Sequence, residues 1–406
     1  MDNVAARQLL VGSFHAAIDA VDPEAAVAAS LGPISGRVGV LAIGKGAPAM
    51  ARGAARALDR PALAGIVVSN HHDEIPDGMQ LVIGSHPVPS AASIDAGQAL
   101  LDFAGSLGAE DTAVVLISGG GSALAEVPVP GVELGDIAAT NELLLRSGAD
   151  IGAVNTVRRR LSRLKGGGLA AAIAPARLIT LAVSDVVGDA PEAIASGPTV
   201  ALADEPDRAL QVVTRLGIAG DLPGAVLAAL EADLGERPLG PNGEFRIVAG
   251  AATAAHAAAS AAERKGVPAT VIDTRMVGDV TEAVGTALRR SGPGMCVFAG
   301  ETTVTVVGDG IGGRNHEAAL VAATVIEGES NVWFLAGGTD GIDGLTQAAG
   351  TVVDGGTVAR GRALGLDAGI ALDRNDSGSF FAQLAEQIIT GPTGTNVGDI
   401  WLVLRD

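Results

Sequence analysis

The feature that most constrains the fold is an alternation of short apolar runs with longer helical stretches. Five runs in the first half are apolar throughout, without the regular polar positions of a half-exposed strand. Continuous apolar runs are typical of parallel strands that helices cover on both faces, and their alternation with helices is typical of α/β layering. The five predicted strands are residues 37–44, 63–70, 79–85, 112–120 and 177–185.

Helices are expected between these strands, and a similar rhythm continues in the second half. The predicted helices of the first half are residues 16–31, 47–58 and 90–107. The second half opens with a strand–helix–strand pattern over residues 245–274. Further strands are expected over residues 294–300, 302–308, 331–338 and 399–406, and helices over 317–326 and 377–388.

A polar section that contains Pro and Gly, residues 222–244, separates the two halves. We therefore expect two α/β domains, residues 1–235 and residues 236–406. Because α/β folds bind ligands at the carboxyl ends of their strands, we expect the active site in the cleft between the domains.

Charge and composition exclude several classes of protein. The formal net charge of −19 argues against nucleic acid or an anionic membrane as a partner, but it leaves room for a small phosphorylated ligand that responds to local charge. The single Cys296 lies in an apolar stretch and is expected to be a buried structural thiol, which fits a reducing compartment. No apolar run reaches the length of a membrane span, and the N-terminal residues lack the pattern of a secretory signal. We therefore expect a soluble, cytoplasmic protein.

The first predicted strand leads directly into Gly44-Lys45-Gly46 and then a helix. Glycines there let the backbone approach a ligand, and a lysine at that point favours an anion. A surface lysine beside a structural turn is the simpler alternative. The spacing also fits a loose dinucleotide fingerprint, but the second strand ends in Ser69-Asn70, where a ribose-binding acid would be needed. A Walker loop is absent as well.

Two further segments are candidates for phosphate binding. Gly119, Gly120, Gly121 and Ser122 follow the fourth strand, and successive N–H groups in such a turn form a cradle for phosphate oxygens. The alternative is a turn that serves only chain reversal. Residues 155–170 carry four arginines and Lys165 just before three glycines, the one concentrated positive segment of the chain. A solvated helix face is the alternative there.

In the second half, glycines lead to Arg314, Asn315 and Glu317 at the opening of a helix. Arginine suits carboxylate or phosphate, although a structural pair with Glu317 is equally expected. Acidic residues also follow strands, and carboxylates there could hold Mg²⁺ or simply accept hydrogen bonds from their own turns. These residues are Asp185, Asp189, Asp340, Asp343 and Asp376. The histidines show no metal-binding spacing, and residues 84–89 indicate a strand end that leads into a turn.

Taken together, these motifs resemble those of the MOFRL-type glycerate 2-kinase family, in the family's order, over about residues 40–400. The segments that carry the resemblance are GKGA, SHPVP, SGGGSAL, NTVRRRLSRLKGGGLA, VSDVVGDAPEAIASGPT, GETTVTV, GGRNHE, GTDGIDG, NDSGSFF and TGPTGTNVGD. The resemblance implies a Rossmann-like N-terminal domain, a second α/β domain, and ATP with a divalent metal. It also implies D-glycerate phosphorylated at its 2-hydroxyl, with Lys45 and Arg314 as catalytic residues.

The remaining assignments combine the family's motifs with chemistry. We expect the ATP phosphates on Gly44, Gly46, Gly119, Gly120, Gly121, Ser122 and Lys165. We expect glycerate on Glu301, Arg314, Asn315 and Asn375, and Mg²⁺ on Asp185 and Asp189. The chain departs from the usual family pattern at Ser90, His316, Leu345, Gln347 and Gly378, so a larger hydroxy acid could be the acceptor instead. Two rival hypotheses are an NAD(P)H-dependent hydroxypyruvate reductase and a binding protein for hydroxy acids.

Overall fold

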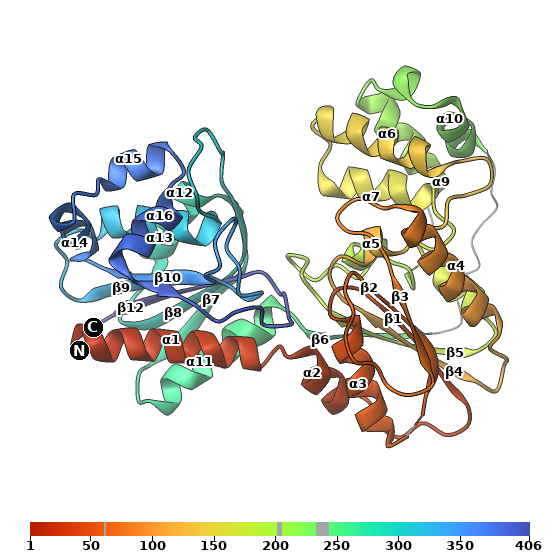
Figure 1. Ribbon diagram of the computed structural model, residues 1–406, viewed down its shortest axis with the longest axis horizontal. Coiled ribbons are helices and arrows are strands. Elements are labelled where there is room, and N and C mark those ends of the chain that lie inside the picture. The colour runs from red at the N-terminus through yellow and green to blue at the C-terminus, as the bar shows by residue number, and fades with distance from the viewer. Residues whose placement is uncertain (61, 201–204, 233–242) are drawn as a thin grey trace. The chain divides into compact units, whose positions relative to one another are not determined.

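The computed structural model describes residues 1–60, 62–200, 205–232 and 243–406. The chain divides into two compact units. We call Pro23–Ser184 with Asp189–Val248 the N-terminal unit, and Met1–Asp22 with Asp185–Gly188 and Ala249–Asp406 the C-terminal unit. Each contains one six-stranded sheet with helices packed on it, so the expected α/β class is confirmed (Figure 1).

The sheet of the N-terminal unit has the strand order β3-β2-β1-β4-β5-β6. The pairs that join β1 to β5 are all parallel, as the apolar runs predict. The order reverses between β1 and β4, and in open α/β sheets ligands bind beyond the carboxyl ends of the strands at such a point. The strands are β1 Val38–Ile43, β2 Ala64–Ser69, β3 Met79–Ile83, β4 Thr112–Ile117, β5 Arg177–Val183 and β6 Glu244–Ala249.

Four helices of the N-terminal unit form a second, smaller apolar core with its own buried residues. They are α6 Leu134–Arg146, α7 Ile151–Arg160, α9 Glu205–Arg215 and α10 Gly224–Glu231. Figure 1 shows them gathered beside one another, away from the strands of this unit. The other helices are α2 Pro23–Ser30, α3 Ala47–Leu58, α4 Ala91–Gly105, α5 Gly121–Leu124 and α8 Gly168–Ile173.

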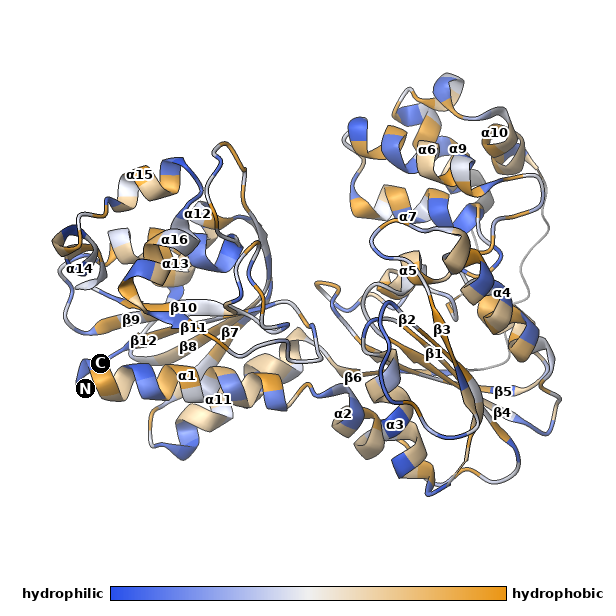
Figure 2. Cartoon of the chain, viewed as in Figure 1, coloured by the Kyte–Doolittle hydropathy of each residue, from blue (hydrophilic) through white to orange (hydrophobic). Residues whose placement is uncertain are grey.

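The sheet of the C-terminal unit is mixed, with the order β11-β10-β9-β12-β8-β7. Only β7 and β8 pair in parallel, and the other neighbours are antiparallel. The strands are β7 Ala269–Asp279, β8 Gly294–Thr303, β9 Val332–Gly338, β10 Gly350–Asp354, β11 Gln387–Ile388 and β12 Asp399–Arg405. Figure 2 shows apolar residues concentrated on the strands and polar residues on helix surfaces and loops.

Helices cover both faces of this sheet. Helices α1 Asn3–Asp19 and α11 Ala251–Arg264 pack together on one face, and α12 Val280–Arg290 and α13 Arg314–Val325 lie on the other (Figure 1). Buried residues of α12 and α13 join those of the strands in one core. The remaining helices on that side are α14 Thr357–Ala363, α15 Ala368–Asp373 and α16 Ser377–Leu384.

Several sequence-based expectations need correction. The predicted strand–helix–strand pattern over residues 245–274 does not open the second domain, because β6 belongs to the first sheet and β7 to the second. Residues 1–22 group with the C-terminal unit, since the apolar face of α1 packs against α11 and the second sheet. The single helix expected over residues 16–31 is two helices, and the predicted strand over residues 302–308 ends at Thr303. The expected boundary between residues 235 and 236 lies outside the described residues.

In the described part of the chain, none of the helices has the length and apolar character that crossing a membrane requires.

Phe14 anchors α1 to the C-terminal unit, where it is completely buried. We expect Phe14→Ala to lower the free energy of unfolding by about 3–5 kcal/mol, because it removes a large buried ring and leaves a cavity. Val4→Ala on the same helix is a matched control, since Val4 is 66% exposed and should change stability little. Urea denaturation of the three proteins measures the difference, and equal losses for both variants would contradict this packing of α1.

Candidate active site

The glycine turn after β1 lies against the turn after β4, at the point where the strand order of the N-terminal unit reverses. The N–H of Lys45 donates to the carbonyl of Gly119 (2.9 Å), and the N–H of Gly46 donates to Oγ of Ser118 (3.0 Å). Gly44 has φ +133°, and a Cβ there would lie 2.6 Å from the carbonyl oxygen of Ser118. Only glycine allows the two turns to approach this closely, so packing requires a glycine at position 44.

The triglycine turn presents unpaired backbone donors. Within the described residues, the N–H groups of Gly119 and Gly120 donate no hydrogen bond, whereas the turn that follows is closed by bonds from Ala123 and Leu124 to Gly120. Gly120 has φ +83°, a conformation that favours glycine. Oγ of Ser122 instead forms a hydrogen bond with Oγ of Ser196 (2.9 Å). The predicted phosphate cradle therefore keeps its free donors on the glycines.

Residues of this turn help to line a cavity of about 150 Å³. Its volume is well below the roughly 300–1,000 Å³ of pockets that enclose a drug-sized ligand, so it suits a small acid or a phosphoryl group. It is lined by His86, Pro87, Pro89, Gly120, Ser122, Ala123, Glu126, Ile137, Asn141, Arg158 and Lys165. Two cations and one carboxylate line it, so its local charge is positive in a chain whose formal net charge is −19.

Lys165 lines the cavity but is only 2% exposed, and its ammonium forms an ion pair with Glu126. Lys165 therefore contributes positive charge to the cavity wall as a buried, paired side chain and not as a surface cation. The arginines that precede Lys165 in the sequence have different surroundings. Nε of Arg158 donates to Oδ1 of Asn141 (2.8 Å) at the cavity, whereas the buried Arg159 and Arg160 bond to backbone carbonyls. The alternative of a solvated helix face is wrong for these buried arginines.

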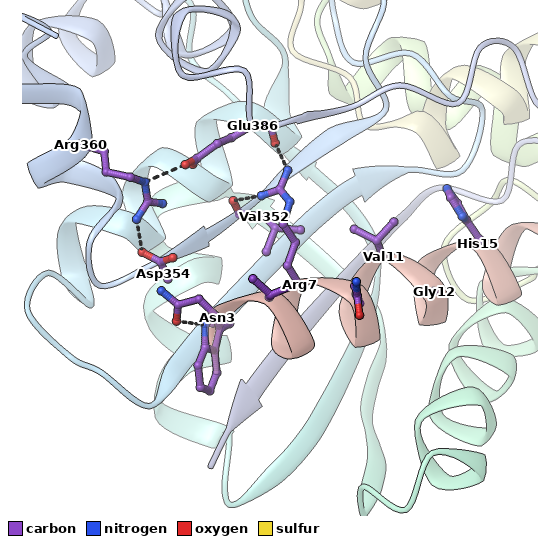
Figure 3. A pocket seen from close by; sticks show the side chains of 12 residues that line it. Asn3, Arg7, Val11, Gly12, His15, Val352, Asp354, Arg360 and Glu386 are labelled. Atoms are coloured by element: carbon purple, nitrogen blue, oxygen red, sulfur yellow. Dashed lines mark hydrogen bonds and ion pairs between the residues drawn. The ribbon is translucent and has the colours of Figure 1, made fainter. Parts of the chain in front are cut away.

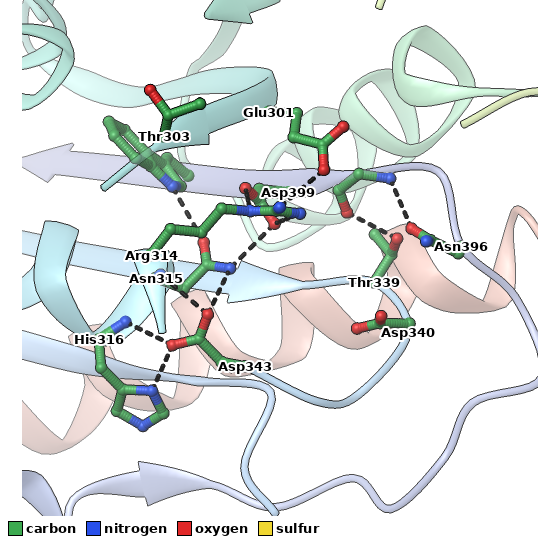
Figure 4. A network of polar contacts seen from close by, with 12 residues as sticks. Glu301, Thr303, Arg314, Asn315, His316, Thr339, Asp340, Asp343, Asn396 and Asp399 are labelled. Carbon is green, nitrogen blue, oxygen red and sulfur yellow. Dashed lines mark hydrogen bonds and ion pairs between the residues drawn. The ribbon is translucent and has the colours of Figure 1, made fainter. Parts of the chain in front are cut away.

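The C-terminal unit holds a second polar cluster at the start of α13 (Figure 4). Arg314 donates two hydrogen bonds to Asp399, the first residue of β12. They run from Nε to Oδ2 (2.6 Å) and from Nη2 to Oδ1 (3.1 Å). Its Nη1 donates to Oε1 of Glu301 at the end of β8 (2.6 Å). The side chain of Arg314 remains 33% exposed and that of Glu301 46% exposed. The expected pair with Glu317 is wrong, since Arg314 takes these two carboxylates.

Asn315 and Asp343 form the floor of the same cluster. Nδ2 of Asn315 donates to Oδ1 of Asp399 (2.9 Å), and its Oδ1 accepts from the indole of Trp401 (3.1 Å). The carboxylate of Asp343 accepts the N–H groups of Asn315 (3.0 Å) and His316 (2.8 Å), so it caps α13. Nδ1 of the buried His316 lies 2.5 Å from the same carboxylate. Asn315 is thus fully engaged within the protein.

Burial and charge act in opposite directions on the central pair. Complete burial raises the pKa of Asp399 to about 6, although hydrogen bonds from Arg314 and Asn315 oppose this. Burial disfavours the charged guanidinium of Arg314, but Asp399 and Glu301 outweigh it and raise the pKa of Arg314. Arg314 is therefore always charged, and its buried partner is the group that titrates.

The other predicted ligands are not brought into these clusters as expected. Oδ1 of Asn375 accepts the N–H groups of Val307 (2.8 Å) and Gly308 (3.0 Å), so the side chain fastens the loop before Arg314. Asp185 lies in the C-terminal unit and Asp189 in the N-terminal unit. The described residues contain no group of three or more His, Cys, Asp or Glu side chains that could hold a metal. The predicted role of Asp185 and Asp189 as magnesium ligands stays a prediction.

A larger cavity of about 720 Å³ lies in the C-terminal unit, between α1 and the strands β9 and β10 (Figure 3). Its cations are already engaged, since Arg7 donates to the carbonyl of Glu386 (2.8 Å) and Arg360 pairs with Asp354 (2.8 Å) and Glu386 (2.7 Å). None of the residues predicted to bind ligand lines it. We do not assign it to the reaction.

Three residues of the two clusters were not predicted from the sequence, namely His86, Glu126 and Asp399. His86 follows β3 at the same sheet edge as the glycine turns, which is the signal that could have found it, whereas Glu126 comes after the short helix α5. Asp399 begins a strand and gives no such signal, because its partner is 85 residues away in the sequence.

Comparisons with known proteins identify relatives of this chain over almost its whole length. Residues 9–231 match the description "Domain of unknown function (DUF4147)", and residues 294–399 match the "MOFRL family". A D-glycerate 2-kinase of Thermotoga maritima is 36% identical over 97% of this chain and 97% of its own length. This chain belongs to the MOFRL-type glycerate 2-kinase family.

Other members of the family carry two kinds of name. A protein of Agrobacterium vitis, named a putative hydroxypyruvate reductase, is 39% identical over 99% of this chain and 95% of its own length. The solved structure of glycerate kinase from Thermotoga maritima is 35% identical and superimposes with a TM-score of 0.91, over 99% of this chain and all of that one. The fold predicted from the family resemblance is therefore confirmed.

The raised pKa of Asp399 predicts a pH effect on stability. The folded chain retains this proton up to about pH 6, whereas the unfolded chain loses it near the ordinary value of 3.8. Protonation therefore stabilises the folded state as the pH falls through 6, and this stabilisation is lost as the pH rises. Relative to Asp399→Asn, which cannot titrate, wild-type unfolding free energy should rise by about 1 kcal/mol between pH 7 and pH 5. A difference that stays constant over this range would contradict the assignment.

Proposed function

We propose that this chain is an ATP-dependent kinase that phosphorylates D-glycerate at its 2-hydroxyl and releases 2-phosphoglycerate. The observation that carries the proposal is the anion site of the N-terminal unit, where unpaired N–H groups of Gly119 and Gly120 adjoin Lys45. Phosphoryl transfer needs positioned donors and charge neutralisation more than covalent help. Its relatives named D-glycerate 2-kinase and glycerate kinase support the choice of acceptor.

In the N-terminal unit, the backbone donors of the triglycine turn bind phosphate oxygens of ATP. The side chain of Lys45 adjoins the same glycine, since its Cγ would lie 3.3 Å from a Cβ at Gly120. A cation about 4 Å from a phosphate oxygen gains roughly 4 kcal/mol in a partly dry site, against roughly 1 in water. Lys45 therefore neutralises charge on the transferring phosphoryl group, while the buried Lys165 and the half-buried Arg158 make the cavity positive.

In the C-terminal unit, Arg314 binds the carboxylate of glycerate. Asp399 holds the guanidinium by two hydrogen bonds from the buried side, which fixes its plane. Glu301 occupies the more exposed side and can move away when a substrate carboxylate takes its place on Nη1. Glu301 is then free to accept a hydrogen bond from a hydroxyl group of the substrate. Asn315 acts through Asp399, because its own amide is engaged within the protein.

Mg²⁺ is expected with ATP, and one oxygen of the N-terminal unit fits it. Oδ1 of Asp189 is shielded from solvent and has no hydrogen-bond partner among the described residues. A single carboxylate with nucleotide phosphates and waters is an ordinary Mg²⁺ ligand set. Asp189 would hold the ion, with Asp185 as the second candidate. Bound Mg²⁺ would neutralise phosphate charge.

The reductase alternative lacks its ribose ligand. Strand β2 ends at Ser69, and the first acidic residue after it, Asp73, is paired with Arg52 of α3 (3.2 Å). A dinucleotide-binding fold needs a carboxylate at this strand end for the ribose hydroxyls. The kinase is therefore the function we propose. Its substrates are small molecules, and we place the reaction in the cytoplasm, where ATP is available.

The experiment is a coupled assay of ADP release with ATP, Mg²⁺ and D-glycerate, with the product identified by phosphorus NMR. Lys45→Ala and Arg314→Ala should each lower kcat/KM by about 100- to 1,000-fold, because each removes a charge that stabilises the transition state. The matched controls are Lys265→Ala and Arg289→Ala, at exposed cations outside both clusters.

The acceptor is tested in the same assay. ADP release only with larger hydroxy acids would keep the kinase and change its substrate, and the departures from the family pattern at Leu345 and Gly378 would then be the first positions to examine. Oxidation of NAD(P)H by hydroxypyruvate, without ADP release from any acceptor, would overturn the proposed function in favour of the reductase.

A further inference from the structure

We propose that His86 is a further catalytic residue, the base that accepts the proton of the substrate's 2-hydroxyl during phosphoryl transfer. This inference rests on the proposed kinase function and deepens it. His86 lies in the segment whose sequence pattern indicates only a strand end and a turn. The structure confirms that turn, and it also places His86 on the wall of the cavity beside the triglycine turn.

The ring of His86 lies beside the triglycine turn. A Cβ at Gly120 would lie 3.1 Å from Cδ2 and 3.3 Å from Nε2 of His86, so the Nε2 edge of the ring faces the turn. The same point lies 3.3 Å from Cγ of Lys45. The imidazole and the lysine therefore converge on one glycine, next to backbone donors that are free to bind a phosphoryl group. A hydroxyl group that attacks this phosphoryl group lies within reach of the ring.

The ring nitrogens of His86 are available to a substrate. Its ring makes no hydrogen bond or ion pair with the described residues, although it lines a polar cavity. The other proton acceptors that line the cavity are engaged: Glu126 pairs with Lys165 and accepts the N–H of Val127 (3.0 Å), and Ser122 bonds to Ser196. Among the lining side chains, His86 is thus the one free base.

The charges around His86 favour its neutral form. Partial burial and the nearby ammonium of Lys45 lower the pKa of His86, so the ring is neutral at physiological pH and its lone pair is available. The charged groups that line the cavity with it are Arg158 and Lys165 from the basic segment and Glu126 after α5. Because the two cations outnumber the one carboxylate, these groups also favour the neutral form of the ring, as Lys45 does. A bound phosphate would raise the pKa again and strengthen the base when it is needed.

The step balances without a further reactant. The 2-hydroxyl oxygen forms a bond to the γ-phosphorus as the bond from that phosphorus to the β,γ-bridging oxygen breaks. ADP leaves with the electron pair of the broken bond, and the hydroxyl proton passes to His86. The imidazolium returns this proton to solvent when the product leaves.

The first test does not depend on activity. Proton NMR follows the ring C2–H signals of the full-length protein with pH, and His86→Gln identifies the signal of His86. We expect the pKa of His86 to lie below the ordinary value of about 6.5. It should be higher in the Lys45→Met variant, and it should also rise when inorganic phosphate or ADP is added. A pKa at the ordinary value that responds neither to Lys45→Met nor to these anions would overturn the proposal.

The second test is kinetic, with His72→Gln as the matched control at an exposed histidine of the same unit. His86→Gln should lower kcat by about 100-fold or more with a smaller change in the KM for glycerate, and it should abolish the acid limb of the kcat/KM profile. Because Asp399 also titrates near pH 6, the limb is assigned to His86 only if its midpoint equals the NMR value and moves in Lys45→Met.

The outcomes separate the two proposals. If wild type transfers phosphate to an acceptor and His86→Gln keeps both its rate and its acid limb, the role of His86 is wrong and the kinase stands. If wild type releases no ADP with any hydroxy acid, the kinase proposal is wrong and this one falls with it.

Discussion

The site of the N-terminal unit depends on the close approach of two turns at one edge of a parallel sheet. Gly44 has no side chain, so its backbone packs directly on Ser118, and the hydrogen bond from Lys45 to Gly119 locks the two turns together. This contact occurs where the strand order reverses between β1 and β4, so the chain leaves the sheet in opposite directions on either side. This contact positions the unpaired amides and Lys45.

The cations of the two polar clusters are paired in different ways. In the C-terminal unit, Arg314 and Asp399 are paired before any substrate binds, so the guanidinium is held in one orientation and the buried carboxylate bears the cost of desolvation. In the N-terminal unit, Lys165 is paired from below, whereas Lys45 is exposed and its ammonium has no partner among the described residues. The cation of the C-terminal unit is therefore paired, whereas Lys45 of the N-terminal unit leaves its ammonium open to a ligand.

Local patterns predicted the parallel sheet and the glycine turns, because those features depend on neighbouring residues. Continuous apolar runs mark β1 to β5, and Gly44 and Gly120 take conformations that glycine favours. The sequence could not show that β6 completes the first sheet, or that α1 belongs to the second unit, because both depend on packing between distant segments. The partner of Arg314 was likewise hidden, since Glu317 is nearer in sequence than Asp399. Lys165 was found, but not its buried ion pair.

The most direct test of this account is a crystal structure of the full chain with Mg²⁺ and a non-hydrolysable ATP analogue. The account predicts phosphate oxygens about 2.7–3.2 Å from the N–H groups of Gly119 and Gly120, with the ammonium of Lys45 beside the γ-phosphate. Phosphates bound elsewhere, with these two amides still facing solvent, would contradict it.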